Sequence, residues 1–261
     1  MSTDVEPIVD TAELREHIRD MYREVAERPG GDFHFELGRP VAERLGYPAA
    51  WLDAIPADAL ASFAGVGHML DLARIQPGES VLDLGSGSGT DSFIAAYLTG
   101  ASGRVMGVDM TDAQLSKARR LRDEAGVAQL VFVKGLIEQP PAEPESIDVV
   151  ISNGVINLAP DKDAVFRAAA AALRPGGRLA IADIVSEREL IERTRRNVSL
   201  WAACIAGAVP EHDYVTAIEA AGLEIELVRP NDYAFISPRA QAAADKYGVT
   251  SVTVLAVKPL S

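Results

Sequence analysis

Short apolar runs alternate with stretches of helical periodicity along most of the chain. The runs predict strands and the stretches between them predict helices. Because parallel strands need long crossover segments, this alternation predicts an α/β fold: a Rossmann-like, mostly parallel sheet with helices on both faces. The predicted strands lie at about 80–84, 104–108, 129–133, 147–152, 178–183, 223–228 and 251–257, the last antiparallel at the sheet edge. The predicted helices lie at about 90–98, 111–125, 161–173 and 212–221.

The first 63 residues lack this alternation. Residues 11–28 place apolar side chains at helical spacing, with Thr11 as the predicted N-cap. Since this amphipathic helix precedes the first strand, we predict that residues 1–63 form a helical cap or lid. Further short helices are predicted at 41–45, 57–63 and 64–73.

The cap precedes an α/β domain that we assign to residues 64–261. Two segments of that domain, at about 184–210 and 229–248, do not fit the repeating pattern and are predicted insertions. In open α/β sheets ligands bind beyond the carboxyl ends of the strands, so insertions at that end are candidate covers for a substrate.

Composition excludes several classes of function. A formal net charge of −13 argues against a nucleic-acid partner, since phosphate backbones are bound by clustered lysine and arginine. No apolar run approaches the ~20 residues of a membrane span, and the acidic N-terminus does not resemble a signal peptide. A single cysteine, Cys204, is typical of a reducing compartment. We therefore expect a cytoplasmic protein with no nucleic-acid or membrane partner; its oligomeric state is left open.

The stretch VLDLGSGSGTD, residues 81–91, is the main candidate binding motif. An apolar run that contains Asp83 ends in glycines at alternate positions, after which a helix is predicted. Gly85, Ser86 and Gly87 would let the chain turn sharply and let a ligand lie against the backbone. Such a loop suits a nucleotide-like cofactor.

Acidic residues favour one cofactor over another. Asp109 ends the second predicted strand, where a carboxylate can accept hydrogen bonds from both ribose hydroxyls of an adenosine; alternatively, it caps the next helix. The third glycine comes too early for the dinucleotide pattern Gly-x-Gly-x-x-Gly, and Asp83 would face a pyrophosphate unfavourably. S-Adenosylmethionine has an amine, a carboxylate and no phosphate, and therefore fits better.

The remaining predicted cofactor contacts come from neighbouring elements. Tyr22 lies on the apolar face of the first helix, where it would close over the sulfonium. The others lie at or just beyond the ends of the second, third and fourth strands, where backbone amides and side chains would meet the adenosine. They are Met110, Ile137, Glu138 and Asn153.

Longer strings point to a family. VLDLGSGSGTD, GRVMGVDMTDAQLSKAR, VISNGVINLAPDKDAVFRAAAAALRPGGRLAIADIV and CIAGAV together resemble the arsenite S-adenosylmethionine methyltransferases. The similarity covers roughly residues 12–228 in order, including HIRDMYREVA and LGYPAAWLDAIP. The resemblance implies a class I methyltransferase fold, with S-adenosylmethionine as methyl donor and S-adenosylhomocysteine as product.

The chain departs from that family at the substrate-binding residues. The family holds trivalent arsenic with several thiolates, since soft thiolates suit a soft metalloid. At positions of the family's cysteines this sequence has Val66 and Gly154 and keeps only Cys204, and residues 31–35 contain no thiol. One sulfur cannot form a three-thiolate site. The resemblance therefore supports the cofactor and not the metalloid substrate.

We therefore predict a methyltransferase that acts on a small organic acceptor, bound in an apolar cavity left at Val66 and Gly154. Two candidate catalytic residues follow. His68 matches a family segment that borders the transferred methyl, and its neutral imidazole could take a proton from the acceptor. Cys204 is the other candidate, with a role in packing as its alternative. Neither is essential to the prediction, because the sulfonium is an activated leaving group.

Two alternatives remain open at this stage. The chain could methylate trivalent arsenic, or another metalloid, delivered already bound to thiols, with Cys204 as the only protein ligand. It could instead be a non-catalytic protein that binds S-adenosylmethionine or its product. No metal site is predicted, because His34, His68 and Cys204 are too widely separated to form a typical ligand motif.

Overall fold

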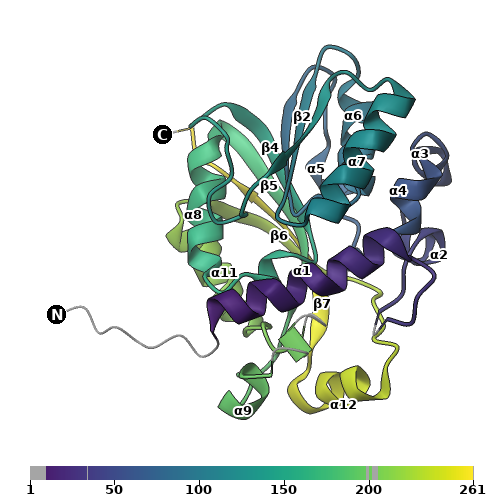
Figure 1. Cartoon of the computed structure of the whole chain (residues 1–261). Helices are drawn as coiled ribbons and strands as arrows, with labels where there is room; N and C mark the ends of the chain where they lie inside the picture. Colours follow the sequence, from purple (N-terminus) through teal and green to yellow (C-terminus); the bar gives the residue numbers. More distant parts are fainter. Residues whose placement is uncertain (1–9, 34, 198–199, 202–204, 261) are drawn as a thin grey trace.

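The computed structural model describes residues 10–33, 35–197, 200–201 and 205–260. Its centre is a seven-stranded sheet in the order β3-β2-β1-β4-β5-β7-β6, with helices packed on both faces (Figure 1). The predicted α/β fold is therefore confirmed. The strands are β1 Ser80–Leu84, β2 Arg104–Asp109, β3 Leu130–Lys134, β4 Ile147–Asn153, β5 Leu173–Val185, β6 Glu224–Pro230 and β7 Thr250–Val257.

One strand runs against the others. The pairs β1–β2, β1–β4, β2–β3 and β4–β5 are parallel, whereas β7 is antiparallel to both β5 and β6. The predicted reversal of the last strand is confirmed, but its predicted edge position is wrong. Residues 251–256 of β7 are all buried, as in an interior strand, whereas β6 exposes several side chains and forms the edge.

Successive side chains of β1 point to opposite faces of the sheet, and each face packs on its own set of helices. Val81 of β1 belongs to one core cluster with α5, α6 and α7, whereas Leu82 and Leu84 belong to another with α8 and α11. Figure 1 shows these two sets of helices on opposite sides of the sheet. Their bounds are α5 Leu70–Ala73, α6 Thr90–Thr99, α7 Asp112–Ala125, α8 Lys162–Ala172 and α11 Glu211–Ala220.

The first helix, α1 Thr11–Glu27, crosses the end of the sheet at which the parallel strands finish (Figure 1). Its N-cap is Asp10 rather than the predicted Thr11. The Asp10 carboxylate accepts hydrogen bonds from the backbone N–H groups of Ala12 (2.8 Å) and Glu13 (3.2 Å), which a threonine one position later would not reach. Three short helices follow: α2 Arg39–Arg44, α3 Ala49–Asp53 and α4 Ala57–Ala61, of which α3 was not predicted.

The predicted helix over residues 64–73 is only partly formed, because α5 begins at Leu70. In the preceding loop the Val66 N–H donates to Asn153 Oδ1 (2.8 Å), and Asn153 Nδ2 donates to the Gly67 carbonyl (3.0 Å). Backbone groups that a helix would pair internally are thus bonded to the end of β4. Long-range bonds have overridden the local helical pattern here.

The predicted insertions contain α9 Glu192–Arg195 and α12 Pro238–Tyr247, which lie at the same end of the molecule as α1 (Figure 1). They contact each other through Thr194 Oγ1 and Tyr247 Oη, 3.1 Å apart. A short 3₁₀ helix, η1 Ile156–Leu158, follows β4. In the part of the chain that the structure describes, no helix is long and apolar enough to cross a membrane.

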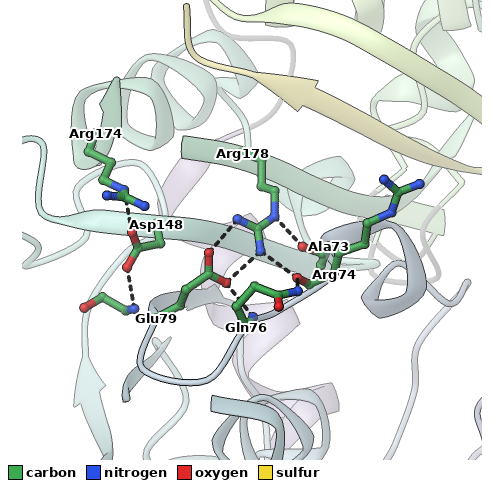
Figure 2. Close-up of polar contacts among 8 residues, drawn as sticks. Ala73, Arg74, Gln76, Glu79, Asp148, Arg174 and Arg178 are labelled. Atoms are coloured by element: carbon green, nitrogen blue, oxygen red, sulfur yellow. Dashed lines mark hydrogen bonds and ion pairs between the residues drawn. The ribbon is translucent and has the colours of Figure 1, made fainter. Parts of the chain in front are cut away.

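An ion-pair network closes the opposite end of the sheet (Figure 2). Arg178 of β5 donates two hydrogen bonds to the carboxylate of Glu79, at 2.8 and 2.7 Å, and further bonds to backbone carbonyls at the end of α5. Asp148 of β4 accepts from the Ser80 N–H (2.7 Å) and pairs with Arg174. These contacts connect β1, β4 and β5 where the first two begin, away from the carboxyl ends.

Candidate active site

A pocket opens at the carboxyl ends of the parallel strands, beside α1. The empty space of the pocket, counted together with its open mouth, is about 1000 Å³. All ten residues predicted as cofactor contacts line this one pocket, although they come from five separate segments. They are Tyr22, Asp83, Gly85, Ser86, Gly87, Asp109, Met110, Ile137, Glu138 and Asn153. Whether they bind a cofactor stays a prediction.

The glycine loop joins β1 to α6 in a conformation that side chains disfavour. Gly85 has φ +78°, and a Cβ at that position would lie 2.4 Å from the side chain of Val155. The Gly87 N–H donates to Asp109 Oδ2 (2.9 Å), which ties the loop to the end of β2. The Ser86 hydroxyl is buried, and no described residue forms a hydrogen bond with it. The loop therefore presents mainly backbone to the pocket, whereas the Ser86 hydroxyl lies towards β2, where a Cβ added at Gly107 would be 2.8 Å from it.

Asp109 connects the glycine loop to the segment before α7. Besides accepting from Gly87, its carboxylate accepts from the Thr111 N–H (2.7 Å). Burial raises the pKa of Asp109, and these backbone hydrogen bonds oppose the rise. The alternative that Asp109 caps the following helix is not supported, because α7 begins at Asp112 with Thr111 as its N-cap.

Two carboxylates are buried beside the loop. Ser92 Oγ donates to Asp83 Oδ2 at 2.5 Å, and burial together with the nearby charge of Asp91 raises the pKa of Asp83 to about 8. Asp91 lies at the start of α6, and burial raises its pKa to about 6 against hydrogen bonds from Tyr47 and Asn153. Buried carboxylates without a basic partner are costly unless a cation reaches them.

Helix α1 supplies one wall of the pocket. Arg15 Nη2 donates to Glu138 Oε1 at 3.0 Å, and Ile18 and Tyr22 line the pocket one and two turns further along the helix. Gln114 of α7 donates to the Tyr22 carbonyl (2.9 Å), which fastens the carboxyl-terminal half of α1 to the α/β domain. The amino-terminal half is held to the pocket by the Arg15–Glu138 pair.

Asn153 lines the pocket, but the protein itself engages its side chain. Oδ1 accepts from the Val66 N–H, as described above. Nδ2 donates to Tyr47 Oη (3.0 Å), to the Gly67 carbonyl (3.0 Å) and to Asp91 Oδ2 (3.1 Å). In this structure Asn153 therefore supports the wall of the pocket, and a direct cofactor contact by its side chain would have to replace one of these bonds.

The remaining wall is uncharged. Val66 is 1 % exposed and packs behind Gly154, where an added Cβ would lie 3.2 Å from Val66 Cγ1. The predicted apolar cavity at these two positions needs correction, because the valine side chain fills that space and only Gly154 lines the pocket. The uncharged lining residues at this end are Phe63, Ala64, Gly65, Gly154, Val155, Leu158, Ala159 and Pro160.

His68 is not among the residues that line the pocket. Its ring packs on Tyr47, with centroids 4.3 Å apart, and its Nε2 has no hydrogen-bond partner in the described part of the chain. Burial lowers the pKa of His68, which favours the neutral ring. This position disfavours the predicted role of His68 as a general base, because the ring does not line the pocket. It packs instead on Tyr47, whose hydroxyl accepts from the pocket residue Asn153. Cys204, like His34, lies outside the described residues.

Two further expectations concern the surroundings of the pocket. The predicted insertions at 184–210 and 229–248 were candidate covers, but every described residue that lines the pocket precedes residue 161. Among the same described residues, no group of three or more histidine, cysteine, aspartate or glutamate side chains is arranged to hold a metal ion.

Among the residues in or beside the site that were not predicted from the sequence, three matter for its charge and hydrogen bonding. Asp91 directly follows the glycine loop, so its position after a buried strand was a usable signal. Arg15 lies seven residues before Tyr22 on the same helical face and could have been found by that spacing. Tyr47 has no local signal, because its hydrogen bond to Asp91 (2.7 Å) spans 44 residues.

Comparison with known proteins identifies the family. A family model described as a methyltransferase domain matches residues 75–222. An arsenite methyltransferase from Halobacterium salinarum is 37 % identical over 250 residues, which cover 89 % of this chain and 63 % of that protein. The chain thus spans less than two thirds of the length of this relative.

Solved structures agree with that assignment. An arsenic(III) S-adenosylmethionine methyltransferase from Chlamydomonas reinhardtii superposes with a TM-score of 0.62 at 29 % identity, over 85 % of this chain and 74 % of that one. A geranyl diphosphate methyltransferase shares the fold, with a TM-score of 0.65 at 17 % identity, over 94 % and 99 % of the two chains. The chain therefore belongs to the methyltransferase-domain family, and it is similar to the arsenite methyltransferases.

Proposed function

We propose that the pocket binds S-adenosylmethionine and that the chain transfers its methyl group to a small, uncharged organic acceptor. The observation that carries the proposal is the charge of the described lining, in which Asp83, Asp91, Asp109 and Glu138 face Arg15 as the single basic residue. S-Adenosylmethionine has ammonium and sulfonium groups and no phosphate. A dinucleotide would bring a pyrophosphate against the same carboxylates.

The residues present fit this cofactor. Asp109 at the end of β2 would accept from the ribose hydroxyls, since each carboxylate oxygen retains a lone pair beyond its backbone hydrogen bond. Ile137 and Glu138 would face the adenine. The buried carboxylates of Asp83 and Asp91 would meet the ammonium group of the amino-acid end.

The bound cofactor would supply a methyl group that is already activated on its sulfonium. The contribution of the chain is then alignment and exclusion of water rather than proton transfer. Helix α1 covers one side through Ile18 and Tyr22, and the uncharged wall around Gly154 receives the acceptor opposite the methyl group. A pocket without a placed general base is compatible with this chemistry.

The acceptor class follows from the uncharged wall. Leu158, Ala159 and Pro160 line this wall and would contact an apolar group, and the acidic end of the pocket would repel an anionic acceptor such as a carboxylate or a phosphate. Among the described lining residues there is no thiol to hold a metalloid.

One competing function has specific support. The relatives at 37 % and 29 % identity are arsenic methyltransferases, and Cys204 matches one of the cysteines implied by that resemblance. Methylation of a metalloid delivered with its own thiols is therefore the second candidate. A non-catalytic binding protein with the same pocket is the third, and only turnover distinguishes it from an enzyme.

A ligand titration tests the first half of the proposal. S-Adenosylmethionine and S-adenosylhomocysteine should raise the melting temperature in a dose-dependent way, whereas NAD should not. Stabilisation by NAD alone would refute the cofactor assignment. Incubation with labelled S-adenosylmethionine and a library of neutral organic acceptors tests the second half, and binding without any methylated product would favour the non-catalytic reading.

A further inference from the structure

Asp91 and its neighbours form a hydrogen-bonded group whose arrangement the proposed function leaves unexplained. Asp91 Oδ1 accepts from Tyr47 Oη (2.7 Å), and Asp91 Oδ2 accepts from Asn153 Nδ2 (3.1 Å). Tyr47 belongs to the segment between α2 and α3, within the predicted cap, yet its side chain reaches a residue that lines the pocket. The cap therefore contributes a group to the inside of the site as well as a helix over it.

The two buried carboxylates of the pocket receive different numbers of hydrogen bonds from side chains. Both oxygens of Asp91 receive a hydrogen bond from a side chain, whereas Asp83 receives one from Ser92. Two neighbouring buried carboxylates cannot both ionise cheaply, so they share a proton. The negative charge therefore lies on Asp91, which receives two hydrogen bonds from side chains, and the proton lies on Asp83, which receives one.

We propose that Tyr47 is a positioning residue of the cofactor site: with Asn153 it holds the negative charge of the carboxylate pair on Asp91, ready for the cationic end of the ligand. This inference rests on the proposed function, in which the ligand is S-adenosylmethionine or S-adenosylhomocysteine. Their ammonium group would then displace the proton that Asp83 carries in the free protein.

The direction of the pKa shifts agrees with this geometry. Burial raises the pKa of both carboxyl groups, and the charge of Asp91 raises the pKa of Asp83 further, in the direction of an ionised Asp91 and a protonated Asp83. The other groups that face the pair are Asp109 from β2, which raises the pKa of Asp83, and the His68 ring, which packs on Tyr47. Removal of the tyrosine hydroxyl would raise the pKa of Asp91.

The chain contains a matched control for a buried tyrosine–aspartate hydrogen bond. Tyr214 Oη donates to Asp183 Oδ2 at 2.8 Å, and burial raises the pKa of Asp183 to about 6, as for Asp91. Neither Tyr214 nor Asp183 lines the pocket. If the role of Tyr47 were purely structural, Tyr47→Phe and Tyr214→Phe would therefore have the same effect on the affinity for S-adenosylhomocysteine.

The test measures the dissociation constant of S-adenosylhomocysteine by calorimetry between pH 6 and pH 8.5. We expect Tyr47→Phe to bind about tenfold more weakly than wild type at pH 6, with the difference shrinking below about twofold at pH 8.5, where Asp91 is ionised in both proteins. Tyr214→Phe should match wild type at every pH, even if both variants lose similar melting temperature. Equal affinity of all three proteins at pH 6, or a loss in Tyr47→Phe that does not depend on pH, would overturn the proposal.

Two further measurements show whether Tyr47 acts through Asp91 and whether the carboxylate pair carries a proton. In an Asp91→Asn background the Tyr47→Phe change should cost less than about twofold, because a residue that acts through Asp91 has no effect once that charge is gone. If Tyr47→Phe does not fold, proton release on binding decides: wild type should release about one proton at pH 7 and Asp91→Asn clearly less, whereas equal release would refute the shared proton. Absence of any binding to wild type would instead refute the proposed function.

Discussion

At the scale of single residues, the site is built from carboxylates that the fold keeps away from water. Asp83, Asp91 and Asp109 all have a raised pKa because of burial, and each is relieved by hydrogen bonds from backbone or side chains. Such groups lower the stability of the free protein and strengthen its attraction for a cation. The free energy that folding loses at these positions is recovered when a cationic ligand binds.

Asp109 offers the most direct test of cofactor recognition. Asp109→Ala removes the carboxylate that would hold the ribose and also frees the Gly87 N–H, so S-adenosylhomocysteine affinity should fall by about 1–3 kcal/mol. Calorimetry measures the change. Asp112→Ala is the control, because Asp112 is exposed and pairs with Lys134 outside the pocket. Unchanged affinity in Asp109→Ala would remove Asp109 from the site.

His68 should make stability depend on pH. Its pKa is lowered from 6.5 mainly by burial, so the unfolded state takes up a proton before the folded state does. The stability that this group contributes is present above pH 6.5 and is lost as the pH falls below it. Between pH 6.5 and 5.5 wild type should lose up to about 1 kcal/mol more than His68→Phe in urea unfolding. Parallel stability profiles for the two proteins would contradict this prediction.

At the scale of elements, one end of the sheet forms the pocket and the other end is held together by ion pairs. The carboxyl ends of the strands carry the pocket and the covering helix α1, whereas the amino ends of β1 and β4 are connected to β5 through the Arg178–Glu79 and Arg174–Asp148 pairs. Variants at the two ends should therefore separate binding from stability.

Deletion of residues 1–30, which removes α1, should weaken cofactor binding more than it lowers the melting temperature. The reason is that α1 contributes Arg15, Ile18 and Tyr22 to the pocket, while the sheet and its two helical layers remain. Calorimetric titration with S-adenosylhomocysteine and thermal unfolding measure the two effects. An unchanged affinity would refute the role of α1 as a lid.

Arg178→Ala should show the opposite behaviour. The Arg178 side chain is only 18 % exposed and bonds both to Glu79 and to the end of α5. Its loss leaves a mostly buried carboxylate and the Ala73 carbonyl without this donor, whereas the Arg74 carbonyl keeps its hydrogen bond from Gln76 Nε2. We expect a loss of about 1–3 kcal/mol in unfolding free energy and an unchanged dissociation constant for S-adenosylhomocysteine. A change in affinity without a change in stability would show that the two ends are not independent.

At the scale of the whole molecule, the substrate is the open question that the family does not answer. Trivalent arsenic is held by bonds to deprotonated thiols, and the two positions that match cysteines of the arsenite enzymes hold Val66 and Gly154 in contact with each other. We therefore expect poor arsenite methylation or none, with slow activity only when excess glutathione supplies the missing ligands.

Methylated arsenic should be assayed for wild type and Cys204→Ser, with and without added thiol. Fast turnover at micromolar arsenite that depends on Cys204 would show that one protein thiolate is enough. Transfer to an organic acceptor that Cys204→Ser leaves unaffected would support the proposed acceptor class.

The sequence by itself predicted those features that depend on neighbouring residues in the chain. Short apolar runs predicted all seven strands, and helical periodicity predicted α6, α7, α8 and α11, because each element buries its own periodic face. The helices α9 and α12 were not predicted. The glycine loop and the acidic strand ends likewise indicated residues that line one pocket. In a parallel sheet the carboxyl ends of the strands meet at one edge, so residues from five separate segments were expected to converge there.

Only the tertiary structure decided the features that depend on distant partners. Strand β7 lies inside the sheet because β6 covers its other side, and residues 64–69 leave the helical conformation because Asn153 binds their backbone. The same holds for Tyr47, which reaches Asp91 across 44 residues, and for His68, which packs behind it instead of lining the pocket. Burial and long-range hydrogen bonding, which no local pattern encodes, determine these positions.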